Sequence, residues 1–195
     1  MAKNAHYRVA YRRRREHKTD YQSRRILAVS KHPRFVVRVS NKGILAQIVK
    51  AEIIGDKVLT QATSNELVTK YGWQASGKSI PAAYLLGLIA GHKAVKEGIK
   101  TAYLDLGLKR PTKGSKIFAV VKGAIDSGLN IPCDSDIIPP PERINGGHIV
   151  NYAKVIDPED YEKNFSVYLR KGMRPESLPE HFEETKKKIQ EDWSQ

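Results

Sequence analysis

The chain has 195 residues, enough for one sizeable core, and a formal net charge of +13. Its single cysteine excludes an internal disulfide and a cysteine metal site, and its six histidines lack ligand spacing, so we expect no metal, cofactor or catalytic residue. The longest uncharged run near a predicted helix, 80–91, is shorter than the roughly 18–20 residues that cross a bilayer, which predicts a cytoplasmic protein without a membrane partner.

Positive charge is concentrated at the N-terminus, where residues 1–31 hold ten Lys or Arg against two Asp or Glu. Four consecutive arginines, Arg12 to Arg15, lie among three tyrosines: Tyr7, Tyr11 and Tyr21. Guanidinium groups bind phosphates in a bidentate fork, and guanidinium and phenol planes can stack on unpaired bases. We therefore predict a basic RNA-binding arm over residues 1–31, with a solvated, disordered tail as the alternative.

Residues 32–131 form the predicted α/β core, which begins with a strand at 34–40. This segment alternates, with apolar side chains on one face and two arginines, Arg34 and Arg38, on the other. Turns then separate it from two further strands at 44–53 and 57–63, so we expect an antiparallel meander. The two arginines are predicted either to contact RNA or to form the solvated side of a half-buried sheet.

A long helix is predicted over 79–97, with Ser79 as its N-cap and Gly98 as the residue that ends it. A short apolar strand at 101–106 and an amphipathic helix at 115–127 follow. A strand–helix pair after a meander predicts a mixed α/β sheet packed on helices.

The C-terminal part, residues 132–195, is predicted to be a helical extension. It starts with a connection rich in proline and aspartate at 132–141, for which we expect an extended path. Three helices are then expected, at 142–156, 158–171 and 178–193.

The segment Gly72–Ser79 reads GWQASGKS and matches the phosphate-binding loop pattern GxxxxGKS. In a true nucleotide-binding loop a buried parallel strand runs directly into the first glycine. Here residues 65–71 are mixed and polar and predict a helical turn instead. Nucleotide binding by a P-loop-type protein is therefore kept as the alternative function.

Several segments together resemble the archaeal form of large-subunit ribosomal protein eighteen, a family related to the eukaryotic carrier of 5S ribosomal RNA. The segments that carry this resemblance are 19–25, 36–42, 46–48, 55–56, 66–67, 71–73, 81–84, 87–88, 146–149 and 178–182. The resemblance implies an α/β core with an extended basic arm and no enzymatic activity. It also implies binding to 5S rRNA and to large-subunit rRNA in the central protuberance, beside neighbouring ribosomal proteins.

Basic, tyrosine and polar side chains of the arm and core are the predicted RNA contacts. Those in the arm are Lys3, Tyr7, Arg8, Tyr11, Arg12, Arg13, Arg14, Arg15, Lys18, Tyr21, Arg24 and Arg25. Those in the core are Arg34, Arg38, Asn41, Lys42, Gln47, Lys109, Arg110 and Lys113. Trp73 is expected either to stack on a base from an exposed loop or to fill the core beneath the long helix.

Overall fold

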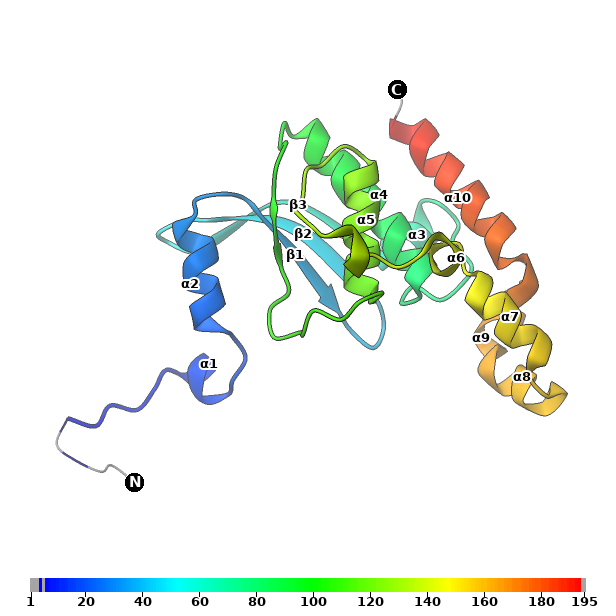
Figure 1. Ribbon diagram of the computed structural model, residues 1–195, viewed down its shortest axis with the longest axis horizontal. Helices are drawn as coiled ribbons and strands as arrows, with labels where there is room; N and C mark the ends of the chain where they lie inside the picture. Colours follow the sequence, from blue (N-terminus) through cyan, green and yellow to red (C-terminus); the bar gives the residue numbers. More distant parts are fainter. Residues whose placement is uncertain (1–3, 5, 194–195) are drawn as a thin grey trace.

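The computed structural model describes residue 4 and residues 6–193 (Figure 1). Its centre is a four-stranded sheet with the order β3-β2-β1-β4. The strands β1 (Arg34–Val39), β2 (Ile44–Ala51) and β3 (Asp56–Thr63) form an antiparallel meander, and β4 (Tyr103–Asp105) pairs in parallel with β1. The predicted mixed α/β sheet is confirmed.

Helices α4 (Ile80–Lys96) and α5 (Lys116–Asp126) cover the apolar face of the sheet. Ser79 caps α4 as predicted, because its Oγ accepts a hydrogen bond from the backbone N–H of Ala82 at 3.3 Å. Gly98 ends the helix with a φ of 76°, a conformation that glycine adopts without strain. Before α4, the short helix α3 (Ser64–Thr69) confirms the predicted helical turn.

The predicted arm projects from the core (Figure 1), and part of it is helical. It contains the short helix α1 (Arg12–Arg15) and the longer helix α2 (Tyr21–Val29). Asp20 starts α2, because one carboxylate oxygen accepts hydrogen bonds from the backbone N–H groups of Gln22 and Ser23 at 3.0 and 3.2 Å.

The C-terminal part contains more helices than were predicted. The segment expected as one helix at 142–156 is α6 (Pro141–Ile144) and α7 (Gly147–Val155), separated by Gly146 with a φ of 92°. The segment expected at 158–171 is also divided.

The segment 158–171 is divided into α8 (Pro158–Asn164) and α9 (Ser166–Arg170). The break falls at Phe165, whose backbone is not helical and whose ring is buried in the core. Two single 3₁₀ turns, η1 (Ser135–Ile137) and η2 (Pro175–Ser177), lie in the connections. The last helix, α10 (Leu178–Trp193), has the predicted bounds.

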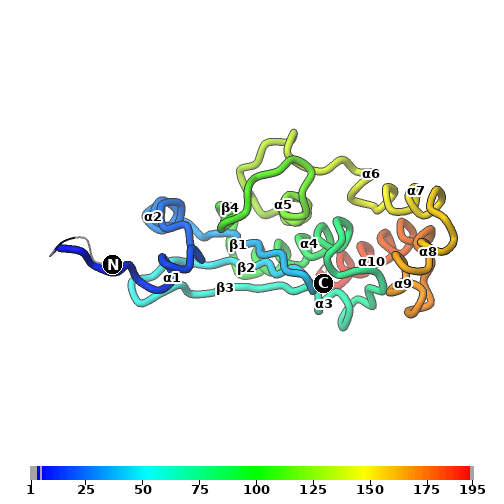
Figure 2. The backbone as a smooth tube through the Cα atoms, turned by 90° about the horizontal axis from the view of Figure 1, so that it is seen from below, coloured from blue at the N-terminus to red at the C-terminus, as the bar shows by residue number. Residues whose placement is uncertain are grey.

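The arm and helices α7 to α9 lie at opposite ends of the molecule (Figure 2). Within residues 4 and 6–193, none of the helices combines the length and the apolar character that a membrane span needs.

Trp73 and His181 attach α10 to the core. Trp73 is 1% exposed, so the predicted stacking of this ring on a base is wrong and the core-filling alternative holds. Its ring lies 5.0 Å from that of His181, and the neighbouring Gln74 N–H donates to His181 Nε2 at 3.1 Å. Because Nε2 accepts this hydrogen bond, His181 must be neutral in the folded protein.

Acidification should therefore weaken the folded state. Burial lowers the pKa of His181 below its usual value of 6.5, so between that value and the folded pKa the unfolded chain binds more protons. Stability should consequently fall as the pH decreases below about 6.5. Thermal unfolding at pH 7.5 and 5.5 measures this effect, and the variant His181→Gln should show a smaller difference in Tm between the two values. An equal pH difference in variant and wild type would contradict the assignment.

Candidate nucleic-acid interface

A cleft of about 570 Å³ lies between the arm and the loop that follows β4. We call it the arm cleft and define it by the residues that line it: Arg13, Lys18–Asp20, Ser23, Arg24, Leu27, Arg38, Val39, Leu104–Lys109 and Pro111. Five of the predicted RNA contacts meet there: Arg13, Lys18, Arg24, Arg38 and Lys109. The fold therefore gathers cations from three separate stretches of the chain around one hollow.

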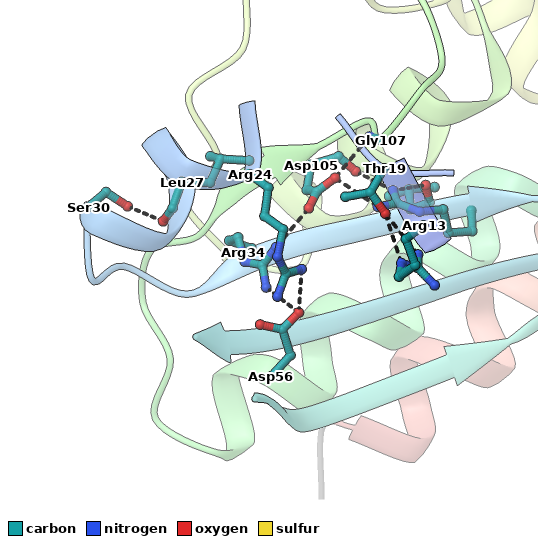
Figure 3. A network of polar contacts seen from close by, with 11 residues as sticks. Arg13, Thr19, Arg24, Leu27, Ser30, Arg34, Asp56, Asp105 and Gly107 are labelled. Atoms are coloured by element: carbon teal, nitrogen blue, oxygen red, sulfur yellow. Dashed lines mark hydrogen bonds and ion pairs between the residues drawn. The ribbon is translucent and has the colours of Figure 1, made fainter. Parts of the chain in front are cut away.

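Arg34, in contrast, is not available to RNA, and its predicted contact is wrong. Its side chain is 3% exposed, with Nη1 3.0 Å from Asp105 Oδ2 and Nη2 2.8 Å from Asp56 Oδ2. The Nη2–Asp56 pair lacks hydrogen-bonding geometry, so this attraction is electrostatic. Arg24 of helix α2 also binds Asp56: its Nη1 donates to Asp56 Oδ2 at 2.8 Å (Figure 3). This contact links α2 to the end of the sheet where β1 begins.

Asp56 thus joins the arm to the sheet. Burial raises the pKa of this carboxyl, but the hydrogen bond from Arg24 and the ion pair with Arg34 outweigh burial and leave the pKa below its usual value. The group is therefore ionised at neutral pH, and it holds the arginine of the arm and the arginine of β1 side by side.

Asp105 fixes the opposite wall of the arm cleft. Its Oδ1 accepts hydrogen bonds from Arg38 Nη2 at 2.8 Å and from the backbone N–H of Gly107 at 2.9 Å. Its backbone oxygen accepts a further hydrogen bond from Arg38 Nη1 at 2.7 Å. Sequence reasoning missed both Asp56 and Asp105 as structural partners, although one aspartate in the otherwise apolar strand 101–106 indicates a buried cation nearby.

The arm side of the cleft keeps most of its charge exposed. Arg13 donates to Thr19 Oγ1 from Nε and Nη2, at 3.1 and 2.9 Å, which fixes the turn between α1 and α2. Lys18 and Arg12 both pair with Glu16, at 2.8 and 2.9 Å, and the hydrogen bond from Lys18 is the main reason that the pKa of Glu16 is lowered.

The remaining predicted arm residues are solvent-exposed, apart from Lys3, which lies outside the described residues. They are Tyr7, Arg8, Tyr11, Arg14, Arg15, Tyr21 and Arg25. The guanidinium of Arg14 lies 5.6 Å from the ring centre of Tyr21, so part of this charge is already stacked. Their contacts with RNA stay predictions.

The other core residues predicted to bind RNA fall into two groups outside the centre of the cleft. Asn41 and Lys42 are exposed in the turn between β1 and β2, and Gln47 is half-buried on β2, where it donates to Gln61 Oε1 at 3.2 Å. Arg110 and Lys113 are exposed beside Lys109 in the loop between β4 and α5.

The GxxxxGKS segment does not have the structure of a nucleotide-binding loop. Helix α3, rather than a buried strand, precedes Gly72. The hydroxyl of Ser79 donates to Ser76 O at 2.9 Å and caps α4, while Trp73 fills the core. Within residues 4 and 6–193, no group of three His, Cys, Asp or Glu side chains is placed to hold a metal ion.

Comparison with known proteins gives concordant matches. Residues 5–101 and 93–134 match the model of a family described as "Ribosomal large subunit proteins 60S L5, and 50S L18". The large ribosomal subunit protein uL18 of Caldivirga maquilingensis is 49% identical over 197 residues, which cover 100% of this chain and 95% of the relative. The protein of the same name from Thermofilum pendens is 50% identical over 194 residues, which cover 98% of each chain.

Proposed function

This chain belongs to the family of ribosomal large-subunit proteins 60S L5 and 50S L18, and from this membership we propose that it binds 5S rRNA. It would attach 5S rRNA to large-subunit rRNA in the central protuberance, within the cytoplasm. The family is one of structural ribosomal proteins, so the proposed role requires binding and no catalysis. The structural observation that supports RNA binding is the convergence of five cations from the arm and the core on the arm cleft.

The proposal assigns different roles to the parts of the chain. The arm, residues 1–31, would lie along RNA phosphates, and the core, residues 32–131, would hold the arm in place and extend the contact surface. Within the extension, residues 132–195, helices α7 to α9 lie at the end of the molecule opposite the arm (Figure 2), which suits contact with neighbouring ribosomal proteins. Its net charge is negative, so it is the part least suited to a phosphate surface.

Removal of residues 1–19 should weaken 5S rRNA binding by at least about tenfold at 100 mM salt, because binding to phosphates dominates this kind of affinity. The plot of log K against log salt concentration should also become flatter, by roughly one unit of slope for each phosphate that the shortened chain no longer binds. The truncation keeps Asp20 and Arg24, so α2 and its ion pair with Asp56 remain. Equilibrium binding over a salt series measures both quantities.

A matched control removes charge from the far end of the chain. The double variant Lys187→Gln/Lys188→Gln alters exposed residues of α10 and should leave both affinity and slope close to those of the wild type. Excess duplex DNA at the same salt concentration should compete less well than unlabelled 5S rRNA. An unchanged slope after truncation would show that the arm does not bind the phosphates.

A further inference from the structure

The arm cleft combines a cationic rim with an apolar interior. Leu104 and Leu106 line it while they pack, partly buried, against the core. Leu108, on the loop after β4, is 60% exposed and is also part of the lining. A phosphate group needs only cations and N–H donors, so the apolar surface indicates a ligand that also has an apolar part.

The two carboxylates that line the arm cleft, Asp20 and Asp105, are bonded to groups of the protein itself, and the charge of Asp105 is balanced by arginines. Asp105 is bonded to Arg34, Arg38 and the Gly107 amide. Asp20 accepts from two backbone N–H groups of α2, and its other oxygen accepts from the hydroxyl of Ser23 at 2.6 Å. These hydrogen bonds, led by the one from the Ser23 hydroxyl, lower the pKa of Asp20.

Two cations of the rim are not paired with a carboxylate of the described residues, although Arg13 is hydrogen-bonded to the hydroxyl of Thr19. Among the part of the chain that the structure describes, Arg13 and Lys109 form no ion pair. One comes from the arm and the other from the loop after β4, so each of the two segments that border the cleft contributes one of them. The cleft thus has two cations without a carboxylate partner among the described residues, in the same lining as Leu104, Leu106 and Leu108.

Arg38 adds a flat surface to the lining of the cleft. Its Nη1 and Nη2 groups donate to Val37 O, Asp105 O and Asp105 Oδ1 at 2.7–2.9 Å, which fixes the plane of the guanidinium. Gly107 packs so closely that a β-carbon there would lie 2.9 Å from Arg38 Cζ. The side chain nevertheless remains 43% exposed, and a fixed guanidinium plane is a surface on which a base can stack.

We propose that the arm cleft binds one unstacked nucleotide of RNA. Its base would lie against Leu108 and the guanidinium of Arg38, and the phosphates on either side of it would contact Arg13 and Lys109. The volume of about 570 Å³ lies within the range of clefts that enclose small organic ligands. This inference rests on the proposed RNA-binding function and specifies one part of it.

The test separates base binding from phosphate binding by its salt dependence. Full-length chains are titrated with transcribed 5S rRNA over a salt series. Leu108→Asn changes no charge, so it should weaken binding about fivefold or more with the slope of log K against log salt unchanged. Lys109→Gln should weaken binding and also reduce the slope by about one unit. The control Val155→Asn, at an exposed apolar residue of α7, should have no effect.

A second experiment identifies the nucleotide that lies in the cleft: Leu108 is replaced by an amino acid with a photo-crosslinking benzophenone side chain. This side chain should react mainly with one unpaired nucleotide of 5S rRNA. Wild-type affinity of Leu108→Asn, or crosslinks spread along a double helix, would overturn the nucleotide site while leaving RNA binding intact. Failure of the wild-type chain to bind 5S rRNA at all would instead overturn the proposed function, and the nucleotide site with it.

Discussion

Replacement of Asp105 by alanine should lower the free energy of unfolding by about 3 kcal/mol, near the lower end of the range for breaking a buried ion pair. The reason is that Arg34, with only 3% of its side chain exposed, would keep its charge and lose one of its two carboxylate partners. Asp56 remains as a partner, which limits the loss. Urea unfolding followed by circular dichroism measures the change.

Two further variants make this prediction specific. Asp136→Ala removes an exposed carboxylate in the connection before α6 and should change stability by less than about 0.5 kcal/mol. The double variant Arg34→Met/Asp105→Leu removes both buried charges and should recover much of the stability, because apolar replacements of a buried pair are often neutral. If Asp105→Ala were as stable as Asp136→Ala, Arg34 would not depend on Asp105.

The same substitution should also affect RNA binding. Asp105 holds Arg38 and the amide of Gly107, so its loss should loosen the wall of the arm cleft that carries Leu108 and Lys109. Stability and affinity should therefore decrease together in this variant. In the truncation of residues 1–19 affinity alone should decrease, because that truncation leaves the ion pairs of the sheet in place.

Gly123→Ala should lower the free energy of unfolding by about 2 kcal/mol or more, because it overpacks the contact between α5 and α4. A β-carbon at this position would lie 2.1 Å from Tyr84 O and 2.8 Å from Leu88 N, both backbone atoms of α4 that cannot rotate away. The opposite glycine, Gly87, is equally constrained, since its β-carbon would lie 2.1 Å from Val120 O. The two helices would have to separate to accept either methyl group.

Alanine has a higher helix propensity than glycine, which by itself would stabilise α5 by about 1 kcal/mol. The predicted decrease in the free energy of unfolding is the net value after this gain is subtracted. Lys122→Ala, at the preceding residue, is the matched control, because it removes only a partly exposed pair with Asp126 and should cost no more than about 0.5 kcal/mol. A variant Gly123→Ala that is more stable than the wild type would mean that α4 and α5 do not approach this closely.

Local sequence was sufficient to predict the regular elements of the core. Alternation of apolar residues predicted β1 because strand side chains alternate between faces, and Ser79 and Gly98 predicted the ends of α4 because caps act on neighbouring backbone groups. The break at Gly146 had a local signal that the prediction missed, the turn-forming sequence Asn145-Gly146-Gly147, whereas the break at Phe165 could not be predicted in this way. The break at Phe165 accompanies the burial of its ring in the core, and that burial depends on distant parts of the chain.

The candidate functional residues also divide into features set by local sequence and features set by distant packing. The sequence by itself determined that the N-terminus is strongly cationic, that the core is a mixed sheet on two helices, and that the chain resembles a ribosomal family, since charge and periodicity are local properties. Only the tertiary structure decided which cations are buried in ion pairs and which remain exposed. Arg34 and Arg38 lie on the same face of one strand, yet Arg34 is buried between two aspartates and Arg38 borders an open cleft. That difference depends on where α2 and the loop after β4 pack, because ion pairing and burial are set by residues far away in the chain.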